Sequence, residues 1–204
     1  KLDRIVGECY NGIQRATYTY APNGNTSMIT DHINGTNYLY YYSSDGDISS
    51  VRVSDTGGTL KYISRYEYDQ YGKLESKQIY FATDIQTNAL LYSVNYRYDS
   101  DGNITSIMNG SGTESYTYDN LGRVSTNKFG SILTDTYTYA AGNGTNYTTG
   151  LVEKVTSTLG TTNSSVTYTY DARGNILQET YGQGDIVYYK YDIDKIKSTV
   201  KSRR

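Results

Sequence analysis

One twelve-residue phrase occurs twice in this chain, as YRYDSDGNITSI from Tyr96 and as YTYDARGNILQE from Tyr168. Further copies begin at Tyr18, Tyr40, Tyr66, Tyr116, Tyr137 and Tyr189, and the copies start 20 to 31 residues apart. A repeat of this period indicates small supersecondary units that each need neighbours to bury their apolar face. We therefore expect a single array over residues 1–204, with copies starting near 18, 40, 66, 96, 116, 137, 168 and 189.

Each copy opens with Tyr-x-Tyr, a pattern that predicts an extended strand with both rings on one face. The residue between the rings then points the other way. These middle residues are Thr19, Tyr41, Glu67, Arg97, Thr117, Thr138, Thr169 and Lys190. Because they are mostly polar, we expect a covered tyrosine face and a solvated opposite face.

Asp-x-x-Gly follows the strand in the clearest copies and predicts a type I turn, with Asp accepting backbone N–H bonds and Gly tolerating positive φ. An aliphatic residue two places after Gly then begins the return strand, at Ile48, Leu74, Ile104, Val124 and Ile176. The predicted fold is all-β, with tandem β-hairpin repeats forming a curved, spiral, solenoid-like sheet. We also expect the tyrosines of stacked hairpins to lie about 4.8 Å apart along the sheet.

The repeat-motif residues are assigned a structural role, as strand tyrosines and turn residues. They are Tyr66, Tyr68, Asp69, Gly72, Tyr96, Tyr98, Asp99, Gly102, Tyr116, Tyr118, Asp119, Gly122, Tyr168, Tyr170, Asp171 and Gly174.

This pattern resembles the YD repeat, also called the Rhs repeat, whose phrase is close to Y-x-Y-D-x-x-G-R-[LIV]. YTYDNLGRV, from Tyr116 to Val124, matches it at every position, and the resemblance extends from Tyr18 to about Asp192. It implies a fragment of a larger bacterial Rhs-like or wall-associated protein, related to toxin-complex shells and to the barrels of animal teneurins. In that family the repeats wind a sheet into a spiral wall, which in toxin complexes closes around a toxic polypeptide. The family's terminal core segment has no counterpart here, so self-cleavage and a particular cargo are not assigned.

Charge and composition limit the partners of the chain. The formal net charge of −2 provides no basic field for nucleic acid. No run approaches the roughly 18 apolar residues that would span a membrane. The chain opens without an initiator Met, so we expect a piece of a longer protein whose cut strand edges associate end to end. A basic tail is expected from about residue 193.

Candidate chemical groups are few. Asp99, Asp101 and Asn103 resemble the first ligands of a calcium loop, but the Gly and Glu of that loop are missing from their places, and turn capping is favoured. His32 and Cys9 are the single residues of their types and form no metal or nucleophile motif. We predict no enzyme activity, no catalytic residue, no cofactor and no metal.

The sequence therefore favours a structural segment of a secreted or cell-surface protein, part of a β-shell that encloses or displays another polypeptide, such as a toxin domain. The alternative is a carbohydrate-binding or adhesion module, in which exposed tyrosine rings stack on a glycan.

Overall fold

The computed structural model describes residues 3–81, 89–142, 148–192 and 195–202. Within these ranges the chain forms strands, turns and irregular connections. No described segment is a helix of the length and apolarity needed to cross a membrane. The chain divides into two compact units, one made of Lys1–Arg97 with Met108–Gly110 and the other of Tyr98–Ile107 with Ser111–Arg204.

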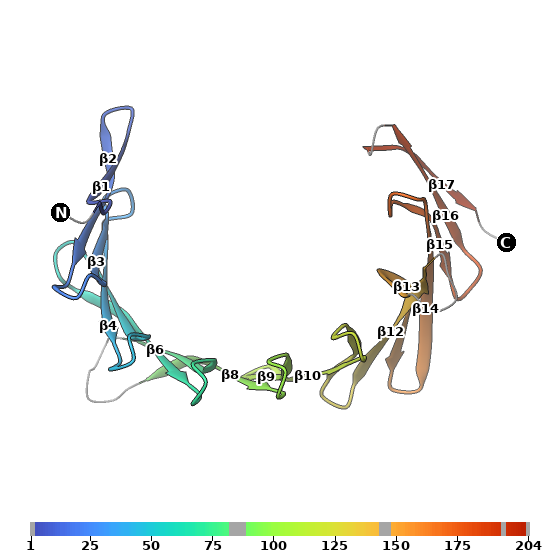
Figure 1. Ribbon diagram of the computed structural model, residues 1–204, viewed down its shortest axis with the longest axis horizontal. Coiled ribbons are helices and arrows are strands. Elements are labelled where there is room, and N and C mark those ends of the chain that lie inside the picture. The colour runs from blue at the N-terminus through green and yellow to red at the C-terminus, as the bar shows by residue number, and fades with distance from the viewer. Residues whose placement is uncertain (1–2, 82–88, 143–147, 193–194, 203–204) are drawn as a thin grey trace. The chain divides into compact units, whose positions relative to one another are not determined.

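Among the described residues, unit 1 contains seven complete strands and nearly all of an eighth, which pair in chain order, each antiparallel to the next (Figure 1). They are β1 (Gly7–Tyr10), β2 (Ile13–Tyr20), β3 (Thr26–Asp31), β4 (Thr36–Tyr42), β5 (Ile48–Asp55), β6 (Leu60–Tyr68), β7 (Leu74–Phe81) and β8 (Leu90–Tyr98, whose last residue belongs to unit 2).

Unit 2 continues the same sequential antiparallel pairing. Its strands are β9 (Ile104–Asn109, which begins in this unit), β10 (Gly112–Tyr118), β11 (Val124–Phe129), β12 (Leu133–Ala141), β13 (Thr148–Leu159), β14 (Thr162–Tyr170), β15 (Ile176–Tyr181), β16 (Ile186–Asp192) and β17 (Lys195–Ser202). The predicted all-β array of tandem hairpins is confirmed.

The aliphatic residues predicted to begin the return strands are confirmed in their places: Ile48, Leu74, Ile104, Val124 and Ile176 are the first residues of β5, β7, β9, β11 and β15. The hairpin register shifts by one residue just before the second tyrosine of the motif, for example between Thr117 and Tyr118. The same bulge occurs between Glu67 and Tyr68. An extra residue on one strand leaves a ladder group locally unpaired.

The two faces of the sheet differ as the sequence predicts. All eight middle residues of the Tyr-x-Tyr motifs are exposed, whereas the flanking tyrosines are partly buried. We call the face that carries the motif tyrosines the tyrosine face. The buried apolar side chains among the described residues are Val51, Val53, Val94 and Val187.

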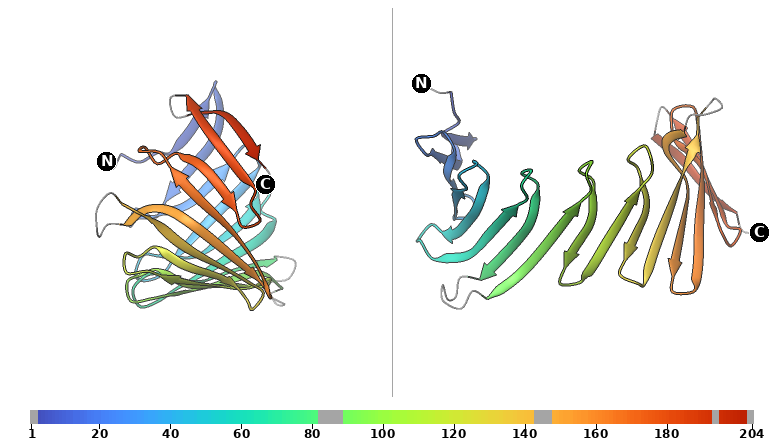
Figure 2. Two further views of the ribbon diagram at one scale, coloured as in Figure 1. Left: turned by 90° about the vertical axis from the view of Figure 1, so that its right-hand side faces the viewer. Right: turned by 60° about the horizontal axis from the view of Figure 1, so that its bottom comes forward.

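Each unit is a single layer of strands, with hairpin turns along both margins (Figure 2). A single layer buries little surface. The accessible area of the chain is 14357 Å² at a mass of 22.9 kDa. A compact monomer of that mass would expose about 9,600 Å².

The expected 4.8 Å spacing of the motif tyrosines is wrong. Consecutive copies occupy alternate strands, because the return strand of each hairpin lies between them. On the tyrosine face, Tyr40 of β4 pairs with Val51 of β5, and Val51 pairs with Ser64 of β6. Motif tyrosines of neighbouring copies are therefore two strands apart, about 9.6 Å.

The segment predicted as a basic tail includes β17, whose backbone pairs with β16 from Lys195 to Ser202. Residues 193–194 and 203–204 of that tail lie outside the described residues, as do parts of the two longest spacers, 82–88 and 143–147.

Candidate functional site

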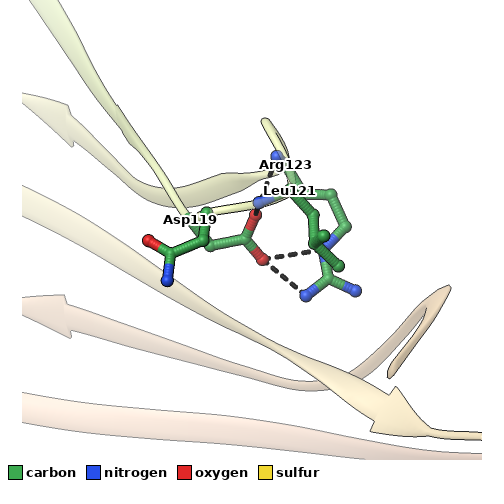
Figure 3. Close-up of a pocket in the computed structure, with 4 residues that line it drawn as sticks. Asp119, Leu121 and Arg123 are labelled. Atoms are coloured by element: carbon green, nitrogen blue, oxygen red, sulfur yellow. Dashed lines mark hydrogen bonds and ion pairs between the residues drawn. The ribbon is translucent and has the colours of Figure 1, made fainter. Parts of the chain in front are cut away.

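The repeated turn is organised by its aspartate, as Figure 3 shows for Asp119. One carboxylate oxygen of Asp119, Oδ1, accepts the backbone N–H bonds of Leu121 and Arg123 at 2.9 and 3.0 Å. The other, Oδ2, accepts from Arg123 Nε at 2.7 Å and forms an ion pair with Nη2 of the same residue. The bond from the Arg123 side chain is the main reason that the pKa of Asp119 lies below its ordinary value.

Gly122 closes this turn by donating its N–H to the Asp119 carbonyl at 2.9 Å, with a φ of 74°. A type I turn followed by a residue in this left-handed region is a standard three-residue hairpin loop. A side chain at Gly122 would have to adopt a backbone conformation that non-glycine residues rarely take.

The same cap recurs at Asp69, Asp99 and Asp171. In each, Oδ1 accepts the N–H bonds of the residues two and four places later, at 2.8 to 3.0 Å. Bonds from the Asn103 and Asn175 amides are the main reason that the pKa values of Asp99 and Asp171 are lowered.

This arrangement bears on the calcium candidate. Both carboxylate oxygens of Asp99 accept bonds from protein donors, two of them from Asn103. Across the part of the chain that the structure describes, no three His, Cys, Asp or Glu side chains gather as a metal site. The turn interpretation of these residues stays a proposal, and the geometry supports it.

In seven of the motifs the second tyrosine donates a hydrogen bond to the segment before its own hairpin. Tyr118 Oη donates to the carbonyl oxygen of Ile104 at 2.6 Å, and Tyr68 Oη donates to that of Ile48 at 3.1 Å. We call such a bond a tyrosine latch. The other latches run from Tyr20 to Ile5, Tyr42 to Thr26, Tyr139 to Val124, Tyr170 to Val152 and Tyr191 to Ile176. In these seven cases the latch joins a hairpin to the segment before it.

An arginine strengthens two of these junctions. Arg123 lies over the ring of Tyr139 at 4.0 Å and donates to the Thr149 carbonyl. Arg4 lies over the ring of Tyr20 at 4.8 Å and donates to the Gly24 carbonyl at 3.0 Å. The sequence signal for this contact was the basic residue just before the aliphatic position, which the motif shows but which we did not interpret.

The first tyrosine of the motif behaves differently. Tyr116 donates to Glu114 in a very short hydrogen bond, which raises the pKa of Tyr116 to about 12. Tyr18 donates to Glu8 at 2.8 Å, and this bond is the main cause of its raised pKa.

In unit 1, the first motif tyrosines Tyr40 and Tyr66, together with Tyr38 and Tyr62, line a hollow of about 440 Å³ on the tyrosine face. Tyr38 and Tyr40 of β4 stand on one side, and Tyr62 and Tyr66 of β6 on the other. The floor between them is made by the small residues of β5, Val51 and Val53, among others. Burial raises the pKa of Tyr40 and Tyr62.

The two other residues considered in the sequence, Cys9 and His32, lie at the N-terminal end of the sheet. Cys9 is a free, exposed thiol on β1. His32 lies beyond the end of β3, and its Nε2 contacts Thr17 Oγ1 at 3.1 Å.

These features define a class of protein: an array of β-hairpins with aspartate-capped turns, joined to one another by tyrosine latches. The RHS repeat family model matches residues 98–131 and 147–186. Over these two stretches the chain is similar to RHS repeats. A comparison with curated sequences finds no significant match.

Solved structures with a similar chain path include the Tc holotoxin pore of Photorhabdus luminescens, at 15% identity over 92% of this chain and a TM-score of 0.41. The TcdB2-TccC3 structure matches at 14% identity over 93% of this chain, with a TM-score of 0.41. This chain spans 13% and 14% of their lengths. A porin-like protein from Bacteroides uniformis matches at 12% identity over 96% of this chain and 80% of its own, with a TM-score of 0.32.

Proposed function

We propose that this chain is a non-catalytic wall segment of a secreted or bacterial cell-surface protein, in which the repeats wind into a curved, spiral sheet that encloses or displays another polypeptide. A toxin domain is one such polypeptide, as the resemblance to Rhs proteins implies. The observation that carries the proposal is the tyrosine latch, which recurs from hairpin to hairpin in both units.

A latch of this kind suits a wall. It connects successive hairpins through side-chain hydrogen bonds in addition to the backbone hydrogen bonds between strands. These side-chain bonds stabilise a sheet that has no second layer packed against it. The large accessible surface leaves both faces available for an enclosed or displayed partner.

The experiment uses the longer polypeptide that contains this chain. We expect segments outside the repeats to resist a protease while the wall is intact. Replacing Tyr42, Tyr68 and Tyr118 with Phe removes latches but keeps the rings, and should speed cleavage of those segments. Cleavage at the same rate in the wild type and the latch variant would overturn the enclosing role. A Tyr71→Phe variant, which alters an exposed turn residue, is the matched control.

End-to-end association of the isolated chain belongs to the same proposal. Sedimentation at millimolar protein should show species larger than the monomer, and a strictly monomeric profile would count against it.

A carbohydrate-binding or adhesion role is the second candidate, favoured by the hollow between Tyr38, Tyr40, Tyr62 and Tyr66. Rings about two strands apart over a valine floor offer apolar faces for stacking, and their hydroxyls offer polar contacts. A glycan array tests this candidate, with Tyr40→Leu and Tyr62→Leu as variants that remove rings. Binding that survives both variants would place the glycan elsewhere.

A further inference from the structure

The hollow on the tyrosine face of unit 1 exists because small side chains lie between large ones. Cross-strand pairing sets Tyr40, Val51 and Ser64 in one row across β4, β5 and β6. Val51 and Ser64 are 8% and 5% exposed, so they form a closed floor. Ser64 also lies between Tyr62 and Tyr66 along β6, and its small side chain leaves a gap between their rings.

The lining of this hollow is mostly apolar. Besides Ser64, the four tyrosines and the two floor valines, the lining residues are Ile48, Lys77, Ile79, Phe81 and Leu91. Among these described residues none carries a carboxylate or a carboxamide. A volume of about 440 Å³ with apolar walls and few polar groups is typical of a site for a small molecule.

One formal charge lies in this lining, on Lys77. Lys77 pairs with Tyr66 across β6 and β7, and its Nζ lies over the Tyr66 ring at 5.7 Å. The residue is partly buried, and within the described ranges no carboxylate lies at ion-pair distance from its ammonium. Glu75, two residues earlier, is exposed and does not line the hollow. The hollow therefore holds a positive charge that no described carboxylate neutralises.

This charge is a local feature and not part of the repeat. The position directly opposite the first motif tyrosine holds Lys77 across from Tyr66. The same position holds Asn127 across from Tyr116 and Glu179 across from Tyr168. Cross-strand partners share one face of the sheet, so the tyrosine face is cationic at the hollow and anionic near Tyr168.

We propose that the hollow binds a small apolar monocarboxylate, with its acyl or aryl part against Val51 and Val53 and its carboxylate at the Lys77 ammonium. Valine side chains and tyrosine rings remove the hydrocarbon part from water, and the ammonium complements the single negative charge. Such a ligand fits the lining better than a neutral sugar, because the lining lacks the carboxylates and carboxamides that would bind several hydroxyls. Carrying a small molecule is a role beyond that of the wall.

The test follows the ring signals of Tyr40, Tyr62 and Tyr66 by NMR in the 204-residue chain while sodium octanoate is added. We expect saturable shifts in the millimolar range. Lys77→Met removes the charge and keeps an apolar chain, so it should weaken octanoate binding by about two- to fivefold, the range for a partly exposed ion pair. Binding of octanol, which has the same chain and no charge, should not weaken in this variant.

Lys61→Met is the matched control, because Lys61 is exposed on β6 and does not line the hollow. It should leave octanoate binding unchanged. Equal binding by the wild type and Lys77→Met, or equal weakening in both lysine variants, would overturn the role of Lys77. Shifts of Tyr168 and Tyr170 as large as those of the hollow would overturn the site and indicate unspecific association. Should Lys77→Met disturb the far-UV circular dichroism, Lys77→Arg keeps the charge, and loss of binding in that variant would contradict the proposed contact.

Octanoate and phenylbutyrate distinguish the two sources of the carboxylate. Tighter binding of octanoate would assign the hollow to acyl acids, and tighter binding of phenylbutyrate would assign it to aryl acids. Saturable binding of neither acid would overturn the proposal. Cellobiose tests the neutral sugar. Shifts of the same rings with cellobiose and not with either acid would overturn the carboxylate ligand and support the glycan candidate instead.

Discussion

The phenolic hydroxyl of Tyr118 donates a 2.6 Å hydrogen bond to the carbonyl oxygen of Ile104, the first residue of the return strand in the preceding hairpin. Tyr118 thus belongs to two structures at once: its backbone closes its own hairpin against Val124, and its side chain holds the hairpin before it. In the motifs that end in Asp-x-x-Gly, the turn follows the second tyrosine directly. The turn sets where the return strand starts, and the start of that strand is where the next latch attaches.

The latch predicts the effect of removing one hydroxyl. Tyr118→Phe keeps the ring and leaves the Ile104 carbonyl without its donor, so we expect a loss of about 1 kcal/mol in the free energy of unfolding. Urea denaturation followed by circular dichroism measures it. Tyr71→Phe, at a residue that is 77% exposed, should leave the midpoint unchanged. Equal midpoints for both variants would mean that the latch does not stabilise the sheet.

The aspartate caps predict acid sensitivity. The pKa values of Asp31, Asp99, Asp119 and Asp171 are lowered in the folded chain, mainly by side-chain hydrogen bonds. A lowered folded pKa contributes stability above the unfolded pKa, near 3.9, and that stability is lost as the pH falls through the folded value. The urea concentration at the midpoint of unfolding should therefore decrease as the pH is lowered below about 4.

Asn substitution separates this titration from the cap itself. Asp119→Asn keeps an oxygen that accepts the two backbone N–H bonds but cannot ionise, so its stability should depend less on pH in the acid range. Asp45→Asn is the control, since Asp45 lies in the turn after β4 and is exposed. An unchanged acid profile in Asp119→Asn would show that the cap charge does not contribute.

The tyrosines predict a second loss of stability in base. Burial raises the pKa values of Tyr42, Tyr68, Tyr118 and Tyr170, and the bond to Glu114 raises that of Tyr116 to about 12. A raised folded pKa contributes stability that is fully present below the unfolded pKa, near 10, and is lost as the pH rises through the folded value. Ultraviolet titration should show Tyr116 ionising among the last. Glu114→Gln should bring its pKa back toward 10, and an unmoved titration would contradict the role of Glu114.

Arg123 couples the cap to the next hairpin, because it contacts Asp119, the Tyr139 ring and the Thr149 carbonyl. A double-mutant cycle of Asp119→Asn and Arg123→Gln should give a coupling of about 0.2–1 kcal/mol, as for other partly exposed pairs. Arg123→Gln alone should cost more than that coupling, since it also removes the contacts to Tyr139 and Thr149. Arg97→Gln, at an exposed middle position, is the control. A cost no larger than that of Arg97→Gln would show that the contact between hairpins carries no stability.

The local features of the repeat could be predicted from the sequence because they are set by neighbouring residues. Alternation placed the tyrosines on one face, and Asp-x-x-Gly placed the turns. The aliphatic residues that begin β5, β7, β9, β11 and β15 were named correctly. Each depends on pleat geometry or turn chemistry within a few residues, which is information that the chain carries locally.

The contacts between hairpins were decided only by the tertiary structure. The motif shows that Tyr118 faces one side, but not that its hydroxyl reaches Ile104, because that bond depends on the bulge beside Tyr118. The predicted spacing of tyrosines in neighbouring copies was wrong for a related reason, because a return strand lies between the strands that carry them. The register between β5 and β6 likewise decides that Arg52 and Arg65 lie on the same face of the sheet. Register follows from the pairing of whole strands, and a one-residue slip would move either arginine to the other face.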